Sequence, residues 1–287
     1  MQQLMFARAS TMQIGFNFTL GKTYEMVQRM LAEGHIDFCE LLIDNFFKVP
    51  ADELARSFEC PVGFHIMFSR YIESDIEYLE DMAKRLRGYI DTLQPLYVSD
   101  HIACFTHRGQ RLFHLGEIDY RTEYQRVRER VERWQDLIGQ RLLLENYPSI
   151  MDGGWHAAEF YERLARETGA GVLFDASNAV CAHLNCGAPL EAWDNVIAST
   201  SHFHVAGYDF SIMEPHVVVD THDGNLSSET IAFLERRRSA FDKPGATMTY
   251  ERDANIDYDS IVVDLRQLRS IFSRNEVSDD ARAACIA

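Results

Sequence analysis

Three features are scarce or absent in this 287-residue sequence, and each absence excludes a class of protein. None of the six cysteines forms a C-x-x-C pair, which argues against a structural zinc site built on thiolates. No apolar run approaches the ~18 residues that a membrane span requires, and residues 1–11 lack the apolar segment of a signal peptide. We therefore expect a cytoplasmic protein with free thiols and no membrane contact.

Positive charge is the third scarce feature. The chain has 28 Lys and Arg against 44 Asp and Glu, a formal net charge of −16. Such a chain repels a phosphate backbone unless a basic patch compensates, and no such patch is evident in the sequence. We therefore expect no nucleic-acid partner. The hydrophobic content of 46% with 25% charged residues is typical of a globular protein with a sizeable core.

Eight segments with strand character alternate with eight helical ones. The expected strands are residues 12–18, 36–42, 61–66, 96–101, 141–146, 171–175, 202–207 and 246–251, and the expected helices are 20–33, 51–57, 73–92, 121–138, 155–167, 188–198, 227–239 and 258–273. This α/β pattern predicts one (β/α)8 TIM barrel over residues 12–274, between an N-terminal extension (1–11) and a flexible C-terminal tail (275–287). A doubly wound open sheet is less favoured, because no G-x-G-x-x-G turn follows the first strand.

Ionisable and amide side chains recur where these strands end. In a barrel, the carboxyl ends of the strands and the following loops form the active face, so distant residues can share one mouth. A single strand-end His is often an ordinary core residue, and a single Asp is often a turn former. The coincidence over six strands favours metal binding, because burying so many ionisable groups without a cation is costly. The candidate ligands are His65, His101, Glu145, Asp175, His204 and Glu251 on strands, with Asn178, Asp220 and His222 expected in loops.

The types and number of these ligands narrow the kind of site. Nitrogen and oxygen donors without thiolate suit iron, manganese or zinc, and spacing does not choose among them. Nine candidates exceed the positions around one octahedral ion, so two or three ions sharing carboxylates would fit. Six neighbouring polar residues could orient the ligands or contact a substrate. These are Asn17, Asp44, Asn45, Asp100, Asn146 and Asp253.

The motifs together resemble those of the multinuclear non-heme iron-dependent oxidases, over residues 12–272. The motifs are Ile14-Gly15, Val62-Gly63-Phe64-His65, Ser99-Asp100-His101, Leu143-Leu144-Glu145-Asn146, Leu173-Phe174-Asp175-Ala176-Ser177-Asn178, Phe203-His204-Val205-Ala206-Gly207, Asp220-Thr221-His222 and Tyr250-Glu251-Arg252-Asp253. Within that family, residues 14–19 and 40–46 look most like the methanobactin biosynthesis branch. Where the more general family pattern has Glu, this sequence has Asp44.

The resemblance implies a TIM barrel that holds two or three irons at the nine candidate positions and uses O2 as co-substrate. It implies a substrate that is a ribosomally made precursor peptide with a leader and core cysteines. In the methanobactin branch, which makes a copper-chelating natural product, a cysteine becomes an oxazolone with an adjacent thioamide. The resemblance also implies a heterodimer with a small, MbnC-like partner protein.

The residues alone leave two other interpretations open. One is a metal-dependent hydrolase or isomerase of the endonuclease IV-like or xylose isomerase-like barrel type, which also gathers His, Asp and Glu at strand ends. The other is a metal-binding or scaffold protein without catalytic activity.

Overall fold

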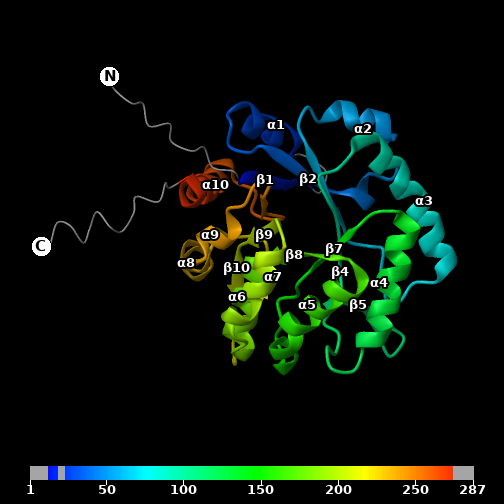
Figure 1. Cartoon of the computed structure of the whole chain (residues 1–287). Coiled ribbons are helices and arrows are strands. Elements are labelled where there is room, and N and C mark those ends of the chain that lie inside the picture. Colours follow the sequence, from blue (N-terminus) through cyan, green and yellow to red (C-terminus); the bar gives the residue numbers. More distant parts are fainter. Residues whose placement is uncertain (1–11, 19–22, 274–287) are drawn as a thin grey trace, which may run out of the picture.

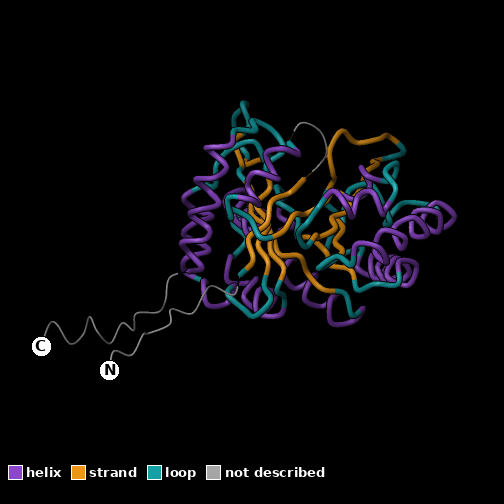
Figure 2. Tube along the Cα trace, turned by 90° about the horizontal axis from the view of Figure 1, so that it is seen from above, coloured by secondary structure: helices purple, strands orange, loops and turns teal. Residues whose placement is uncertain are grey.

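Eight parallel strands close into a barrel in the computed structural model, which describes residues 12–18 and 23–273 (Figures 1 and 2). Around the barrel they are β1 (Gln13–Phe18), β2 (Phe38–Leu42), β3 (Val62–Ile66), β4 (Val98–His101), β7 (Leu142–Glu145), β8 (Gly171–Asp175), β9 (His202–Ala206) and β12 (Thr247–Glu251), which pairs with β1. The predicted TIM barrel is confirmed. The predicted extension and tail lie outside the described residues.

Helices surround the strands (Figure 2). They are α1 (Tyr24–Ala32), α2 (Ala51–Ser57), α3 (Ile76–Leu93), α4 (Tyr124–Ile138), α5 (Ala157–Thr168), α6 (Ala176–Cys186), α7 (Asp194–Ser199), α8 (Ser228–Arg236), α9 (Arg238–Phe241) and α10 (Tyr258–Ser273), with short 3-10 turns η1 (Ile43–Phe46), η2 (Asp152–His156) and η3 (Leu190–Trp193). In α3, for example, Leu79, Met82, Leu86 and Ile90 recur every three or four positions and are buried, as an amphipathic helix requires. Among the described residues, no helix is both long and apolar enough to cross a membrane.

The prediction was wrong about the segment after Asp175, which was expected to be a loop. Helix α6 begins there, because the Asp175 carboxylate accepts a hydrogen bond of 2.6 Å from the backbone N–H of Asn178 and so caps the helix. Residues 176–182 are all buried, so this part of α6 lacks the polar face that identifies an amphipathic helix. Asn178 therefore lies in the first turn of a helix.

Two hairpins replace segments that were predicted as loops. The first pairs β5 (Cys104–His107) with β6 (Gln110–Gly116), and the second pairs β10 (Tyr208–Phe210) with β11 (Val218–Asp220). Asp220 thus ends a strand and does not lie in a loop. Arg108 and Gly109 make the tight turn between β5 and β6, with φ values of 49° and 73°. Because the hairpins follow β4 and β9, both stand at the carboxyl end of the barrel.

The interior of the barrel changes character along its axis. Phe38, Tyr97, Leu143 and Leu173 form a separate apolar cluster inside the ring of strands. Gly63 leaves room for one of them, since a Cβ at that position would lie 2.6 Å from the Tyr97 ring. Polar side chains gather nearer the carboxyl ends of the strands. The apolar cluster therefore fills one part of the barrel and leaves the other to the candidate site.

Candidate metal centre

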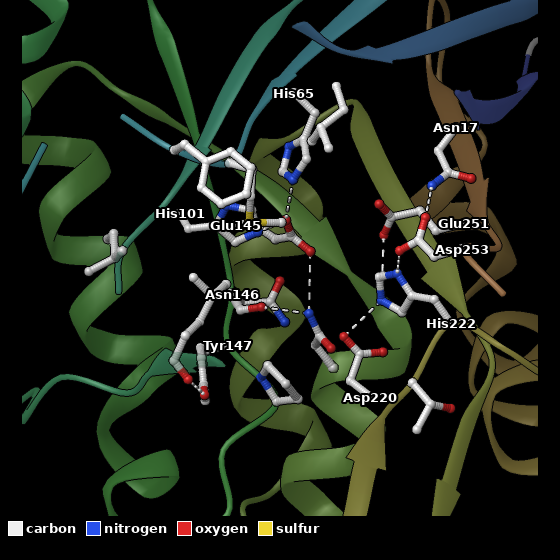
Figure 3. Close-up of a pocket in the computed structure, with 18 of the residues that line it drawn as sticks. Asn17, His65, His101, Glu145, Asn146, Tyr147, Asp220, His222, Glu251 and Asp253 are labelled. Atoms are coloured by element: carbon white, nitrogen blue, oxygen red, sulfur yellow. Dashed lines mark hydrogen bonds and ion pairs between the residues drawn. The ribbon is translucent and has the colours of Figure 1, made fainter. Parts of the chain in front are cut away.

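Predicted ligands converge at the carboxyl ends of the barrel strands, and Figure 3 shows six of them: His65, His101, Glu145, Asp220, His222 and Glu251. One group consists of His65, His101 and Glu145, and a second consists of Glu145, Asp175, His204 and Glu251. Within each group, the potential ligand atoms all lie within 4.8 Å of one another. Glu145 belongs to both groups, which places its carboxylate where it could bridge two ions.

A third set of side chains lies beside the second group. Nε2 of His222 is 2.8 Å from Asp220 Oδ2 and 4.0 Å from Glu251 Oε2. Asn178 connects back to the first group, because its Nδ2 donates to Glu145 Oε1 at 3.3 Å. All nine predicted ligands are thus brought into one region, where Glu145 and Glu251 lie between neighbouring sets.

The imidazoles on β3 and β4 present the same nitrogen to Glu145. Nδ1 of His65 is 2.8 Å from the Ser99 hydroxyl, which itself donates to a backbone carbonyl and therefore accepts from the ring. Nδ1 of His101 is 3.2 Å from the Ile66 carbonyl, which can only accept. When these rings are neutral, each carries its proton on Nδ1. The unprotonated Nε2 of His65 lies 3.4 Å from Glu145 Oε2, and that of His101 lies 3.2 Å from the same oxygen.

Carboxylates outside the ligand set orient the other two imidazoles. Nε2 of His204 is 2.7 Å from Glu40 Oε2, and its Nδ1 lies 3.0 Å from Glu251 Oε2 without hydrogen-bond alignment. Nδ1 of His222 is 3.0 Å from Asp253 Oδ2. Each ring can donate its proton to the outer carboxylate and keep a free nitrogen toward the shared site, as metal-binding histidines do.

The buried ends of the predicted ligands lack hydrogen-bond donors. Among the described residues, nine buried side-chain polar atoms have no hydrogen-bond partner. Six of the nine belong to predicted ligands: Glu145 Oε2, Asp175 Oδ2, Asn178 Oδ1, His204 Nδ1, Asp220 Oδ1 and Glu251 Oε2. Burying such an atom unpaired costs about 1–3 kcal/mol. Cations satisfy acceptors of this kind, so the residues present fit a multinuclear metal site.

The pKa values reflect the same crowding of charge. Burial, together with the neighbouring His101, lowers the pKa of His65 to about 4. Burial opposes protonation of His101 as well, but the adjacent Glu145 carboxylate raises its pKa to about 9. Burial and the nearby carboxylates of Asp220 and Glu145 raise the pKa of Asp175 well above its usual range. Metal ions would supply the positive charge that these carboxylates otherwise draw from protons.

The loop that carries His222 is held in an uncommon conformation. His222 has a φ of 50°, in the left-handed region that a side chain with a Cβ seldom adopts. Backbone hydrogen bonds fix it there, from His222 N–H to the Gly207 carbonyl (2.9 Å) and from Asp253 N–H to the His222 carbonyl (2.7 Å). Gly207 also lets the end of this loop approach closely, since a Cβ there would lie 2.1 Å from the Gly224 carbonyl oxygen. Strain of this kind is typical of functional positions.

Three of the expected supporting residues hold the ligands. Asn17 donates to Asp253 at 2.8 Å, and Asp253 in turn accepts from His222. Asn146 exchanges two hydrogen bonds, of 2.9 Å and 2.7 Å, with the backbone of Asp175. These contacts fix two predicted ligands from opposite sides of the barrel.

The other three expected supporting residues have different positions. Asp44 accepts from the backbone N–H groups of residues 67 and 68, at 3.2 Å and 2.6 Å, and so shapes the loop after β3. Asn45 is exposed and lies outside the described lining of the cavity. Asp100 also lies outside that lining and accepts hydrogen bonds from the Ser69 hydroxyl (2.6 Å) and the Trp134 indole (3.0 Å). Its one hydrogen bond with the predicted ligand His101 is accepted from the His101 backbone N–H.

Glu40, the carboxylate that orients His204, was not among the expected ligands or supporting residues. Glu40 is 1% exposed, and its Oε2 also accepts from the Tyr97 hydroxyl. Its signal in the sequence is a single charge within the apolar strand 38–42, which points into the barrel. Ser99, which orients His65, was likewise quoted only as part of a motif.

A cavity of about 430 Å³ opens beside the ligands. Part of its lining is polar and consists of the His, Asn and carboxylate groups described above. The rest is largely apolar and comes from β2, the loops after β3, β4 and β7, and the β5–β6 hairpin. These apolar residues are Leu42, Met67, Phe68, Ile102, Phe105, Leu112, Leu115 and Pro148. An apolar cavity with a few converging polar groups is the usual form of a small-molecule or side-chain binding site.

Known proteins resemble this chain in sequence or in fold. Residues 17–273 match the family model described as RiPP precursor modification enzyme MbnB/TglH/ChrH. A UPF0276 protein of Rhizorhabdus wittichii is 30% identical over 230 residues, 77% of this chain and 81% of that protein. A UPF0276 protein of Acinetobacter baylyi is 26% identical over 275 residues, 90% and 92% of the two chains. The crystal structure of 3-keto-D-glucoside 4-epimerase from E. coli has a TM-score of 0.57 at 14% identity, over 91% of this chain and 98% of that one, which shows the fold alone.

Proposed function

Because this chain belongs to the MbnB/TglH/ChrH family of RiPP precursor modification enzymes, we propose that it is an iron- and O2-dependent oxidase. Its substrate would be a ribosomally made precursor peptide, in which it modifies cysteine residues. The observation that carries the proposal is the set of six buried acceptor atoms without a hydrogen-bond partner on the predicted ligands. Two or three iron ions would satisfy these acceptors.

The proposed ligands are the nine residues expected from the sequence. They are His65, His101, Glu145, Asp175, Asn178, His204, Asp220, His222 and Glu251. Bound iron would supply one-electron redox chemistry with O2, which the side chains of the chain cannot provide. The nitrogen and oxygen donor set suits such an ion.

The residues of the chain would position the substrate and control access of water. The apolar part of the cavity, including Phe68, Phe105 and Leu112, could pack against the peptide around the reacting cysteine and displace water. Ser99 and Glu40 would keep the histidine protons on the nitrogens that face away from the ions. The ligand geometry is thereby fixed before the substrate arrives.

The finer assignment follows from the motifs of the first two strands. We propose that the reaction is that of the methanobactin branch (MbnB), in which a cysteine becomes an oxazolone and a thioamide. A small MbnC-like partner protein would then help to bind the leader of the peptide. A hydrolase or isomerase remains the competing function, but the fold it shares with this chain says nothing about chemistry.

Expression with the neighbouring small-partner and peptide genes tests this function. The protein should be loaded with iron under nitrogen and then exposed to O2, with O2 uptake and the mass of the peptide as readouts. We expect O2 consumption and a mass change on the peptide, and both should be lost in His222→Ala. His216→Ala is the matched control, because this histidine lies between β10 and β11, in the segment that joins β9 to the loop of His222, but outside the described cavity lining. Bound zinc with no O2 consumption would instead favour a hydrolase.

A further inference from the structure

A single Lys or Arg side chain lines the cavity beside the predicted ligands, among the described residues. Among the described residues that line it, Arg111 is the only Lys or Arg. The carboxylates of the same lining are Glu40, Glu145, Asp220, Glu251 and Asp253. Among the described lining residues, Arg111 therefore supplies the one permanent positive charge, and the other ionisable groups are carboxylic acids, histidines and Tyr147.

The charge of Arg111 is not used within the described part of the chain. No described residue forms an ion pair or a side-chain hydrogen bond with it, and the side chain is exposed. The cavity carboxylates are instead engaged with imidazoles, as in the pairs Glu40–His204 and Asp253–His222. By contrast, Arg126 on α4 is paired with Glu123. The planar fork of Arg111 is thus free to bind a ligand.

The backbone around Arg111 holds it at a defined place. Arg111 pairs with Thr106 across the β5–β6 hairpin. Thr106 is fastened to Glu73, whose carboxylate accepts from the backbone N–H of Phe105 (2.9 Å) and from the Thr106 hydroxyl (2.9 Å). Phe105 and Leu112, on the same hairpin, line the same cavity. The hairpin therefore presents an apolar surface and one guanidinium to whatever enters.

We propose that Arg111 binds a carboxylate of the peptide substrate and so sets which way the peptide enters the site. Guanidinium and carboxylate match as a two-pronged pair. At the ligand end the carboxylates and imidazoles would be occupied by the ions, and Arg111 is the only Lys or Arg among the described lining residues, so it is the side chain left to pair with a substrate carboxylate. A peptide with one carboxylate near its cysteine is therefore stabilised with the thiol at the ligand end and the acid at the hairpin. This inference rests on the proposed peptide substrate.

The carboxylate could come from an Asp or Glu side chain or from the C-terminus of the peptide. The probes are fluorescently labelled pentapeptides with one cysteine and a single carboxylate, either on an aspartate side chain or at the C-terminus. Each has a twin in which that carboxylate is an amide. Their binding to the full chain, loaded with Fe(II) under nitrogen, is measured by anisotropy, so that no turnover interferes.

The variants separate a specific contact from a general charge effect. Arg111→Gln removes the proposed contact. Arg108→Gln is the matched control, since it makes the same charge change on the same hairpin, at an exposed position outside the described cavity lining. A charged hydrogen-bonded pair predicts that the wild type binds one acid peptide about 10- to 100-fold more tightly than its amide twin. That preference should vanish in Arg111→Gln and persist in Arg108→Gln.

The outcomes also tell this inference apart from the proposed function. The acid peptide that shows the preference identifies the source of the carboxylate. Equal binding of acid and amide peptides by the wild type, an unchanged preference in Arg111→Gln, or an equal loss in both variants would overturn the role of Arg111. Failure of the iron-loaded wild type to consume O2 with any cysteine peptide would count against the proposed oxidase instead. With an active enzyme, Arg111→Gln should raise KM for the acid peptide and leave kcat nearly unchanged.

Discussion

Replacing Glu40 should weaken metal binding, although Glu40 is not a proposed ligand. Its Oε2 accepts from His204 Nε2 at 2.7 Å and also from the Tyr97 hydroxyl. Glu40→Leu removes the acceptor and leaves the His204 proton without its outer partner, so the ring can turn its N–H toward Glu251. Loss of a residue that orients a metal ligand typically costs about 10- to 100-fold in metal affinity. That corresponds to about 1.4–2.8 kcal/mol.

Two further variants separate orientation of His204 from general damage. Glu40→Gln keeps one amide oxygen, which has two lone pairs and can accept from both His204 and Tyr97. Tyr97→Phe removes one hydrogen bond to Glu40 but leaves the Glu40–His204 pair intact. Both should bind iron within a few-fold of the wild type. Glu40→Leu also leaves the buried N–H of His204 unpaired, which costs about 1–3 kcal/mol in stability, whereas the Tyr97 hydroxyl keeps Thr249 as a partner at 3.0 Å.

Competition with a chromogenic iron chelator under nitrogen gives the affinity of each variant, and thermal unfolding gives its stability. If Glu40→Leu retains iron as tightly as the wild type, the proposed role of Glu40 is wrong. If Tyr97→Phe loses as much affinity as Glu40→Leu, the effect comes from the barrel interior in general and not from the orientation of His204.

Three other variants or treatments test neighbouring parts of the site. Gly207→Ala should displace the loop of His222, because the new Cβ would lie 2.1 Å from the Gly224 carbonyl oxygen. Elemental analysis should then find less bound iron. Gly88→Ala is the control: its Cβ would meet open space, so the iron content should not change. Removal of iron by a chelator should lower the calorimetric Tm by about 5–10 °C, compared with a sample in which free iron is at 100 times its Kd. An unchanged Tm would argue against a structural contribution of the metal. Asp100→Asn should cost about 1–3 kcal/mol in urea unfolding, because it disturbs the hydrogen bonds to Ser69 and Trp134, while iron content stays the same.

Most barrel strands were predictable because they are short, largely apolar runs, and β4, β7, β8 and β12 each end in His, Asp or Glu. The run 142–145, buried at every position, is an example, and the prediction of 141–146 differs from it by one residue at each end. Helix α6 could not be read in the same way, since burial of Ala176 to Ala182 removes the periodicity. The two hairpins were missed because their strands are short and lie partly exposed outside the barrel.

The convergence of His65, Glu145 and His204 could be predicted from the barrel alone, because parallel strands bring their carboxyl ends to one face. The roles of individual ring nitrogens could not. His204 is oriented by Glu40, which lies 164 positions away in the sequence, and only the pairing of the strands brings the two together. The same holds for Arg111, whose place in the cavity depends on a hairpin that the sequence pattern did not reveal.

The number of irons bound by the full chain tests the central claim most directly. The protein would be reconstituted with Fe(II) under nitrogen, freed of loose metal, and measured by elemental analysis and Mössbauer spectroscopy. Our account predicts two or three irons per chain, with magnetic coupling in the oxidised form through shared carboxylates. At most one iron per chain, or zinc that iron cannot displace, would contradict it.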